Sequence, residues 1–349
     1  MENIKAIIWG FGAMGSGMAK MLLKKKGVDI VGVCDLDPNK IGKNMYEILG
    51  IEQGANPEVI INDNVEKIIA NQSVDIVLLA TDSFTKNAFD KIKLCLENNI
   101  NVVSTAEEMS YPKAKSPELA AKLDKIAKKN GVSVLGTGIN PGLIMDLLVI
   151  TLTGACESVD HIEVERINDL SPFGPAVMEE QGVGKTVEGF EQGVKDNKIV
   201  GHVGFHESIS MIADSLGLKL DGPITQKKNP IISSVDRRGS YVNVKAGDVV
   251  GVEMTGFGMI NGKKMIEMLH PQQIEPQKGN VETGDYIRIK GNPDINMAIN
   301  PEVPGGIGTI AMCINMIPHV INASAGLKTM IDLPVPRAIM GDMRKIIKK

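Results

Sequence analysis

The sequence predicts an α/β protein with a doubly wound parallel sheet, followed by an α+β region whose sheet is mainly antiparallel. Three observations support this prediction. Residues 5–15 read K-A-I-I-W-G-F-G-A-M-G, a buried apolar run that leads directly into G-x-G-x-x-G. Up to residue 135, continuous apolar runs alternate with helix-period stretches, as in a parallel sheet covered on both faces. Beyond residue 150, β-rich runs flank short turn sequences, which is typical of antiparallel hairpins.

The glycine motif predicts a Rossmann dinucleotide-binding domain. Gly10 permits a tight turn, Gly12 lets the backbone approach a pyrophosphate, and Gly15 lets the helix pack closely against the strand. A second β-rich run, 30–34, ends in Asp35, about twenty residues after the last glycine, where this fold places the acid that binds ribose hydroxyls. The alternative is an ordinary glycine turn with Asp35 as a helix cap. The residues that we expect at an NAD cofactor are Gly10, Phe11, Gly12, Ala13, Met14, Gly15, Asp35, Thr81, Asp82, Thr105 and Asn140.

The other elements of the first half follow in order. We expect strands at 75–80, 101–104 and 132–135, and helices at 41–49, 84–97 and 117–129, the last with Ser116 as its cap and Pro117 at its first position. Ligands of such sheets bind outside the carboxyl ends of the strands. These ends are 81–83, 105–108 and the loop 136–142, whose three glycines and one proline require a sharp turn. A plain turn before a helix at 143–150 is the alternative interpretation of Thr137 and Asn140.

The second half predicts hairpins and a buried helix. We expect a strand at 159–166, helices at 185–195 and 208–216, and strands at 248–260 and 263–272 that flank Asn261-Gly262, a strong hairpin signal. A further hairpin joins 286–290 to 295–299. The apolar stretch 307–325 reads as a buried helix that ends at Gly326. The expected division is a dinucleotide-binding domain at 1–145, a substrate and dimerisation domain at 146–304, and C-terminal helices at 305–349 that pack back between the domains.

Composition excludes several classes of function. The chain has 349 residues, which fits two domains, and 43% of them are hydrophobic, as in ordinary globular proteins. The net charge of −4 gives no general field for nucleic acid, and we interpret the basic run 344–349 as a solvated helix end. No apolar run is long enough to cross a membrane. The four scattered cysteines indicate buried thiols in the cytoplasm. Five scattered histidines without H-E-x-x-H predict no metal site.

The glycine motif, the run T-A-E-E-M-S-Y-P at 105–112 and the run G-T-G-I-N-P-G at 136–142 together carry a resemblance. The chain resembles the 2,4-diaminopentanoate dehydrogenase and native amine dehydrogenase family over nearly its full length, including N-D-L-S-P-F-G at 168–174. It is similar more distantly to dihydrodipicolinate reductase and homoserine dehydrogenase. The reductase's H-H-x-x-K-x-D-x-P-S-G-T signature is absent, however, and Glu107-Glu108 replaces the N-K pair of homoserine dehydrogenase.

The resemblance implies an NAD(P)-dependent amine dehydrogenase of ornithine fermentation. It would oxidise the C4 amine of 2,4-diaminopentanoate to 2-amino-4-oxopentanoate and release ammonium, and it would be a homodimer. The family's catalytic glutamate maps onto Glu107 and Glu108, with a slight preference for Glu108. The other glutamate would cap a turn or meet solvent. A carboxylate suits this chemistry because it pairs with an ammonium group, takes its proton and can activate water.

The substrate's carboxylate needs a partner, and the candidates are Arg166, His202 and His206, with Thr137 and Asn140 also expected at the substrate. The fork of Arg166 suits a carboxylate, but a salt bridge with a neighbouring glutamate, Glu163 or Glu165, is an alternative. Either histidine could equally be structural.

The cofactor and the reaction leave further alternatives. Asp35 without a following arginine favours NAD, and Asn39 and Lys40 would let NADP be accepted too. Two other functions stay open: an imine reductase resembling dihydrodipicolinate reductase, and a non-catalytic NAD-binding redox sensor.

Overall fold

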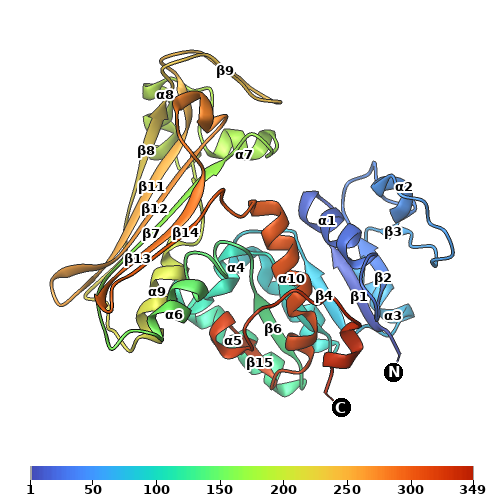
Figure 1. Ribbon diagram of the computed structural model, residues 1–349. Coiled ribbons are helices and arrows are strands. Elements are labelled where there is room, and N and C mark those ends of the chain that lie inside the picture. Colours follow the sequence, from blue (N-terminus) through green and yellow to red (C-terminus); the bar gives the residue numbers. More distant parts are fainter. Residues whose placement is uncertain (1, 349) are drawn as a thin grey trace. The chain divides into compact units, whose positions relative to one another are not determined.

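The computed structural model describes residues 2–348 and confirms the predicted fold class (Figure 1). Within these residues the chain forms two compact units, one made of residues 2–143 and 305–348 and the other of residues 144–304. The first unit contains a seven-stranded parallel sheet and the second contains a six-stranded, mostly antiparallel sheet. Residues 305–348 therefore belong to the unit that contains the glycine motif.

In the described part of the first unit, the strand order is β15-β6-β5-β4-β1-β2-β3, and every neighbouring pair is parallel. The central strands are apolar throughout because both faces are covered, and β4 and β6 are fully buried. The strands are β1 (Ile4–Trp9), β2 (Val28–Cys34), β3 (Ile61–Asn62), β4 (Ile76–Leu79), β5 (Asn101–Ser104), β6 (Ser133–Gly136) and β15 (Gly326–Lys328).

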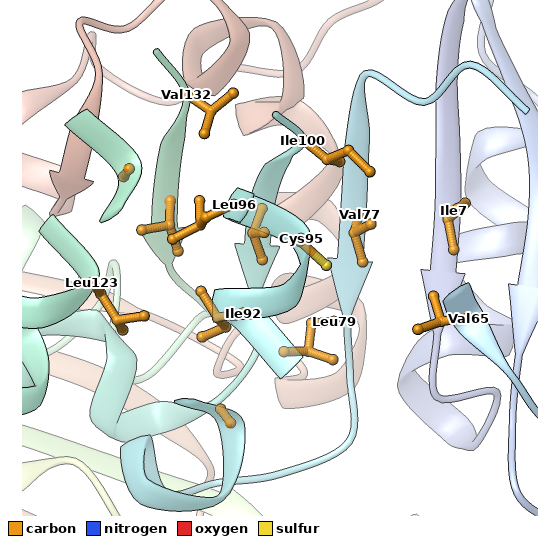
Figure 2. Close-up of a cluster of buried hydrophobic side chains, with 14 of the residues drawn as sticks. Ile7, Val65, Val77, Leu79, Ile92, Cys95, Leu96, Ile100, Leu123 and Val132 are labelled. Atoms are coloured by element: carbon orange, nitrogen blue, oxygen red, sulfur yellow. The ribbon is translucent and has the colours of Figure 1, made fainter. Parts of the chain in front are cut away.

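Helices cover this sheet on both faces. The helices α1 (Ala13–Leu22) and α10 (Gly305–Ile321) contact each other, and α10 also contacts β4, β5 and β6. The other face is covered by α3 (Val65–Asn71), α4 (Thr85–Glu97) and α5 (Pro117–Lys129). Figure 2 shows Ile92 and Leu96 of α4 in this core together with Val77 and Leu79 of β4. The short helix α2 (Met45–Leu49) follows β2.

The described part of the second unit has the strand order β14-β13-β7-β12-β11-β8, in which only β7 and β12 pair in parallel. The helix α9 packs on β11 and β12. The strands are β7 (Ser158–Asp169), β8 (Thr225–Ile232), β11 (Val249–Ile260), β12 (Lys263–Gln273), β13 (Gly284–Asn292) and β14 (Ile295–Ile299), with β9 (Arg237–Arg238) paired to β10 (Asn243–Val244). The helices are α6 (Leu147–Thr153), α7 (Pro175–Glu180), α8 (Val187–Lys195) and α9 (Phe205–Ser215).

The predicted Asn-Gly hairpin is confirmed. Asn261 and Gly262 both have positive φ, 52° and 75°, as a two-residue turn of this kind requires. The pairing register of β11 and β12 shifts between Gly258 and Met259, so one extra residue enters β12. This bulge changes which side chains of the two strands lie opposite each other.

Two predictions for the end of the first unit are wrong. The long apolar helix ends at Ile321 instead of at the predicted Gly326. Gly326, with φ of 131°, starts β15, which pairs with β6. Its backbone is held there because Asp124 Oδ1 accepts the N–H of Leu327 at 3.1 Å. In residues 2–348, no helix is long and apolar enough to cross a membrane.

Candidate active site

The glycine loop joins β1 to α1 with the backbone packed too closely for side chains. A Cβ at Gly10, whose φ is 94°, would lie 2.5 Å from the carbonyl oxygen of Ala80, and a Cβ at Gly15 would lie 1.8 Å from that of Gly10. Gly12, at the start of α1, differs because a Cβ there would meet nothing within 4 Å. The open backbone and the absence of acids from the first turn of α1 suit an anionic phosphate.

Asp35 links the end of β2 to this loop. Its Oδ2 accepts the N–H of Phe11 at 2.5 Å, and its Oδ1 accepts that of Asp37 at 2.8 Å. Lys40 Nζ lies 3.7 Å from Asp35 and 3.3 Å from the carboxylate of Asp37. Phe11 is buried, so it offers the loop backbone groups only. A cation therefore stands beside the expected ribose-binding acid.

The next strand ends carry tethered polar groups. Thr81 lies against Gly10, and its hydroxyl donates to Asp82 Oδ2 at 2.6 Å. Asp82 is also paired with Lys91 at 2.5 Å. Thr105 follows β5, and its N–H donates to the carbonyl of Leu79 at 3.0 Å. These residues lie at the carboxyl edge of the sheet, as the strand pattern predicts.

Glu108 has a structural role in this geometry. It is buried, and its Oε2 accepts the N–H of Thr85 at 2.9 Å, at the start of α4. Its Oε1 accepts from Lys115 Nζ at 3.0 Å. The N-cap residue Phe84 has no side chain that can accept a hydrogen bond, so the carboxylate of Glu108 supplies the cap from another segment. This arrangement does not favour Glu108 as the catalytic base, and it matches the capping alternative for one glutamate of the pair.

Glu107 is half-buried and begins the short 3-10 helix Glu107–Ser110 directly after β5. Its carbonyl oxygen accepts from Ser110 Oγ at 2.8 Å, which fixes the backbone of this turn. Its side chain is attached one residue before that of Glu108, so the two carboxylates leave the backbone in different directions. Glu107 is therefore the member of the pair that is not committed to the α4 cap.

The loop 136–142 contains polar atoms that suit a ligand. Thr137 Oγ1 and Asn140 Nδ2 are buried and have no hydrogen-bond partner among residues 2–348. The loop is fixed from α10, because Thr309 Oγ1 accepts the N–H of Ile139 at 3.2 Å. Gly142, with φ of 130°, returns so close that a Cβ would lie 2.5 Å from Gly138 N. Unsatisfied buried polar atoms and the open backbone at Gly12 together fit a bound dinucleotide.

In the second unit, Arg166 of β7 lies in a buried ion pair. Its Nη1 donates to Asp285 Oδ1, and its Nη2 donates to the carbonyl oxygen of Val303 at 2.6 Å. Both side chains of the ion pair are at most 3% exposed. The neighbouring glutamates, suggested from sequence as partners of Arg166, pair with Arg288 instead. The pairing of Arg166 gives its expected role as a carboxylate anchor no support.

A row of side chains crosses the buried face of this sheet beside Arg166. Met254 pairs with His270 across β11 and β12, and Arg166 pairs with Asp285 across β7 and β13. His270 Nδ1–H donates to the carbonyl oxygen of Arg166 at 2.6 Å. His202 stacks edge-on against His270, with ring centroids 4.9 Å apart, and its backbone N–H contacts Met254 Sδ at 2.8 Å.

Both histidines of this row are held neutral. Burial, and to a smaller extent the charge of Arg166, lower the pKa of His202 to about 3. Burial also lowers the pKa of His270 well below its usual value. His202 Nε2 has no hydrogen-bond partner in the described chain. His206 lies in the first turn of α9 and is half-buried.

Sequence reasoning missed His270, Asp285 and Met254. The period-2 alternation of β12 puts His270 on the same face as Ile266 and Met268, which was a usable signal. Its partners depend on the bulge and on segments far apart in the sequence. In residues 2–348, no group of three or more His, Cys, Asp or Glu side chains could hold a metal ion.

We predict that Arg166→Met destabilises the protein by about 3–5 kcal/mol, because Asp285 is left buried without its cation. Adding Asp285→Asn should restore part of this loss by removing the uncompensated charge. The measurement is urea unfolding followed by circular dichroism. Arg288→Met is the control, since its exposed ion pairs contribute only about 0–1 kcal/mol. Equal losses for Arg166→Met and Arg288→Met would contradict a buried structural ion pair.

Comparisons with known proteins agree with this geometry. Residues 4–135 match the family model for the dihydrodipicolinate reductase N-terminus, and residues 143–349 match that for the 2,4-diaminopentanoate dehydrogenase C-terminal domain. The chain is 60% identical to 2,4-diaminopentanoate dehydrogenase of Acetoanaerobium sticklandii over 349 residues, covering 100% of this chain and 98% of the relative.

Two amine dehydrogenases are also similar. The enzyme of Streptomyces virginiae is 23% identical and covers 96% of this chain and 98% of the relative. The structure of amine dehydrogenase from Mycobacterium smegmatis superimposes with a TM-score of 0.86 at 28% identity, covering 97% of this chain and 98% of that one. The family model that spans the larger part of the chain and the full-length relative agree, and the chain belongs to the 2,4-diaminopentanoate dehydrogenase family.

Proposed function

We propose that this protein catalyses the NAD(P)-dependent oxidative deamination of 2,4-diaminopentanoate at C4, which yields 2-amino-4-oxopentanoate and ammonium. The proposal is supported by 60% identity to a 2,4-diaminopentanoate dehydrogenase over the whole chain. The main observation behind the proposed mechanism is that the Glu108 carboxylate caps α4 and pairs with Lys115. We therefore assign the contact with the reacting amine to Glu107. Ornithine breakdown is the proposed source of the substrate.

In the proposed reaction, Glu107 accepts and releases protons as a general base. Its carboxylate pairs with the substrate ammonium group and accepts a proton from it, because only the free amine can lose hydride from C4. A bound NAD(P)⁺ would supply the hydride acceptor at C4, and loss of hydride from the free amine would leave an iminium. After that first proton has passed from the carboxylate to solvent, Glu107 takes a proton from the water that adds to the iminium and returns it to the nitrogen. Ammonia then leaves and takes the proton of the new hydroxyl, so that ketone and ammonium form.

The first unit supplies the residues that would hold the dinucleotide. The N-terminus of α1 and the backbone of residues 10–15 would bind the pyrophosphate, and Asp35 the adenosine ribose. Thr81, Asp82 and Thr105 lie at the adjoining strand ends. Thr137 Oγ1 and Asn140 Nδ2 offer unsatisfied polar atoms to the cofactor or the substrate.

For the substrate's carboxylate, we assign contact to His202 and His206 and a positioning role to Arg166. His202 Nε2 has no partner in the described residues, and its neutral ring can donate an N–H. Arg166 holds the row in place through Asp285 and through its carbonyl bond to His270.

We predict that Glu107→Gln lowers kcat by about 10²–10⁴-fold with NAD affinity intact, because the amide keeps the shape but cannot accept a proton. Glu108→Gln should instead lower the melting temperature, because its amide replaces the charged cap of α4 and the partner of Lys115. Steady-state kinetics and calorimetry of both variants separate the two roles. Near-native turnover by Glu107→Gln would overturn the assignment.

The same assay tests the other functions. A redox sensor would bind NAD without forming reduced nicotinamide from any amine, and an imine reductase would consume cyclic imines in preference to the diamine. We expect turnover with 2,4-diaminopentanoate and a lower rate with simple amines that lack the carboxylate.

We predict that the enzyme prefers NAD and tolerates NADP. Asp35 would repel a 2′-phosphate, whereas Lys40 beside it would attract one. Lys40→Met should therefore raise the KM for NADP by about tenfold, because one charge-assisted hydrogen bond to the 2′-phosphate is lost. The KM for NAD should stay nearly unchanged. A KM for NADP that equals or falls below the KM for NAD in the native protein would contradict the predicted preference for NAD.

We predict a homodimer. In the second unit, the face of the sheet opposite the buried row carries half-exposed apolar side chains such as Phe257 and Leu269, which a second copy would cover. Light scattering at micromolar concentration should give twice the chain mass of 37.5 kDa. A mass of one chain would contradict the dimer.

The proposed location is the cytoplasm. All four cysteines are free, and three of them, Cys34, Cys95 and Cys313, are buried. Burial raises the pKa of Cys95 and Cys313 to about 12, so these thiols are protected from reaction.

A further inference from the structure

The first unit contains a cavity of about 250 Å³ at the C-terminal end of α10, in which charged and polar side chains stand among apolar ones. Its lining includes His319 and Asn322 from the end of α10, Lys328 from β15, and Arg337 and Lys348 from the segment that follows. The glycine loop and the strand ends described above do not line it.

Positive charge dominates this cavity although the whole chain carries a net charge of −4. Lys328, Arg337 and Lys348 are cationic, and Asp332 is the acidic residue in the lining. Asp332 Oδ2 accepts from both the N–H and the hydroxyl of Thr329 at 2.8 Å, and among residues 2–348 Asp332 forms no ion pair with the three cations. Among residues 2–348, Arg337 and Lys348 form no side-chain ion pair, and Lys328 Nζ contacts only the hydroxyl of Ser324 at 2.9 Å.

His319 gives an independent sign that the cavity receives a ligand. It is only 4% exposed, it lines the cavity, and its Nε2 has no hydrogen-bond partner in the described chain. Burial and the charge of Arg337 lower its pKa, so the ring is neutral and can donate one N–H. A buried donor without a hydrogen-bond partner lowers the stability of the fold unless a bound group accepts its hydrogen bond.

The cavity is separate from the expected dinucleotide site. Thr309 and Ile310, in the first half of α10, contact the 136–142 loop and Gly17 of α1. His319 lies ten residues beyond Thr309, which is about 15 Å along a helix. The two sites therefore lie at opposite ends of the same helix.

The basic run at the end of the chain acquires a role in this arrangement. The sequence predicts a solvated helix end at 344–349. Met343–Ile346 is instead a short 3-10 turn, in which Arg344 pairs with Asp342 at 2.6 Å, and Lys348 reaches the cavity. Lys349 lies outside the described residues.

We propose that this cavity binds a small anion with two or more negative charges, held by Arg337, Lys328 and Lys348 and completed by the N–H of His319. Both a phosphoryl group and a polycarboxylate have this chemistry, since each offers several oxygen acceptors to Arg and Lys. The volume suits a compact anion better than a whole nucleotide, because ordinary ligand pockets measure about 300–1,000 Å³.

The test is calorimetric titration of the full-length protein with pyrophosphate and, separately, with citrate. The protein is saturated with NAD beforehand, so that the glycine loop cannot bind the probe. We expect saturable binding of at least one probe, weakened about tenfold by Arg337→Met because one charge-assisted contact is lost. Binding of pyrophosphate alone would identify a phosphoryl ligand, and binding of citrate alone a polycarboxylate.

Two controls keep the result specific. Arg238→Met removes an exposed arginine of the second unit and should leave binding unchanged. The Nε2 resonance of His319 should shift on titration, and His319→Gln, which keeps a donor, should bind more tightly than His319→Leu. If Arg337→Met fails to fold, Lys328→Met takes its place.

Absence of saturable binding by both probes would overturn the proposal. Binding that is unaffected by Arg337→Met or Lys328→Met would also overturn it. These readouts do not use turnover, so they are independent of the proposed dehydrogenase activity.

Discussion

The close backbone approach at Gly10 constrains the whole carboxyl edge of the parallel sheet. The strand β1 lies between β4 and β2. At its end, the carbonyl oxygen of Trp9 accepts the N–H of Ala80, which follows β4, and the N–H of Gly10 donates to the carbonyl oxygen of Cys34 in β2. Because a side chain at Gly10 or Gly15 would overlap backbone atoms, α1 can start immediately after β1 only with glycine at these positions. The ends of β4 and β5 are thereby brought beside the start of α1, where a dinucleotide would bind.

The Glu107-Glu108 pair shows how one acid can support its neighbour. Glu108 joins the turn after β5 to the N-terminus of α4 and to Lys115, so three segments are fixed through one buried carboxylate. The turn that carries Glu107 is therefore anchored through Glu108 and through the bond from Ser110 Oγ to the carbonyl oxygen of Glu107. In the proposed reaction the two acids cannot exchange roles, because their carboxylates leave adjacent backbone positions in different directions.

Sequence patterns predicted the order of the elements well and predicted long-range pairs poorly. The strands of the parallel sheet before residue 137 have strong apolar periods, and only the two-residue β3 was missed among them. The strand β15 has three residues and depends on pairing with β6, so local propensity could not separate it from the end of α10. The buried partner of Arg166 lies 119 residues away, at Asp285, and no local pattern connects them.

The position of His270 shows that the turn sequence alone does not determine the pairing register of β11 and β12. An Asn-Gly hairpin without a bulge would place Met254 opposite Leu269, and His270 on the other face. The extra residue in β12 shifts this register by one, which puts His270 opposite Met254 on the buried face. A one-residue insertion that leaves no clear mark in the sequence thus decides which side chains form the row.

The charges of that row suit a substrate that carries both ammonium and carboxylate groups. Arg166 is neutralised by Asp285, and His202 and His270 are uncharged because burial and Arg166 lower their pKa values. A free arginine or an imidazolium would bind a carboxylate strongly but would also repel the ammonium groups of a diamino acid. Neutral N–H donors bind the carboxylate oxygens without that repulsion. In the proposed function the ion pair therefore acts indirectly, since it fixes the row while keeping net positive charge away from an amine substrate.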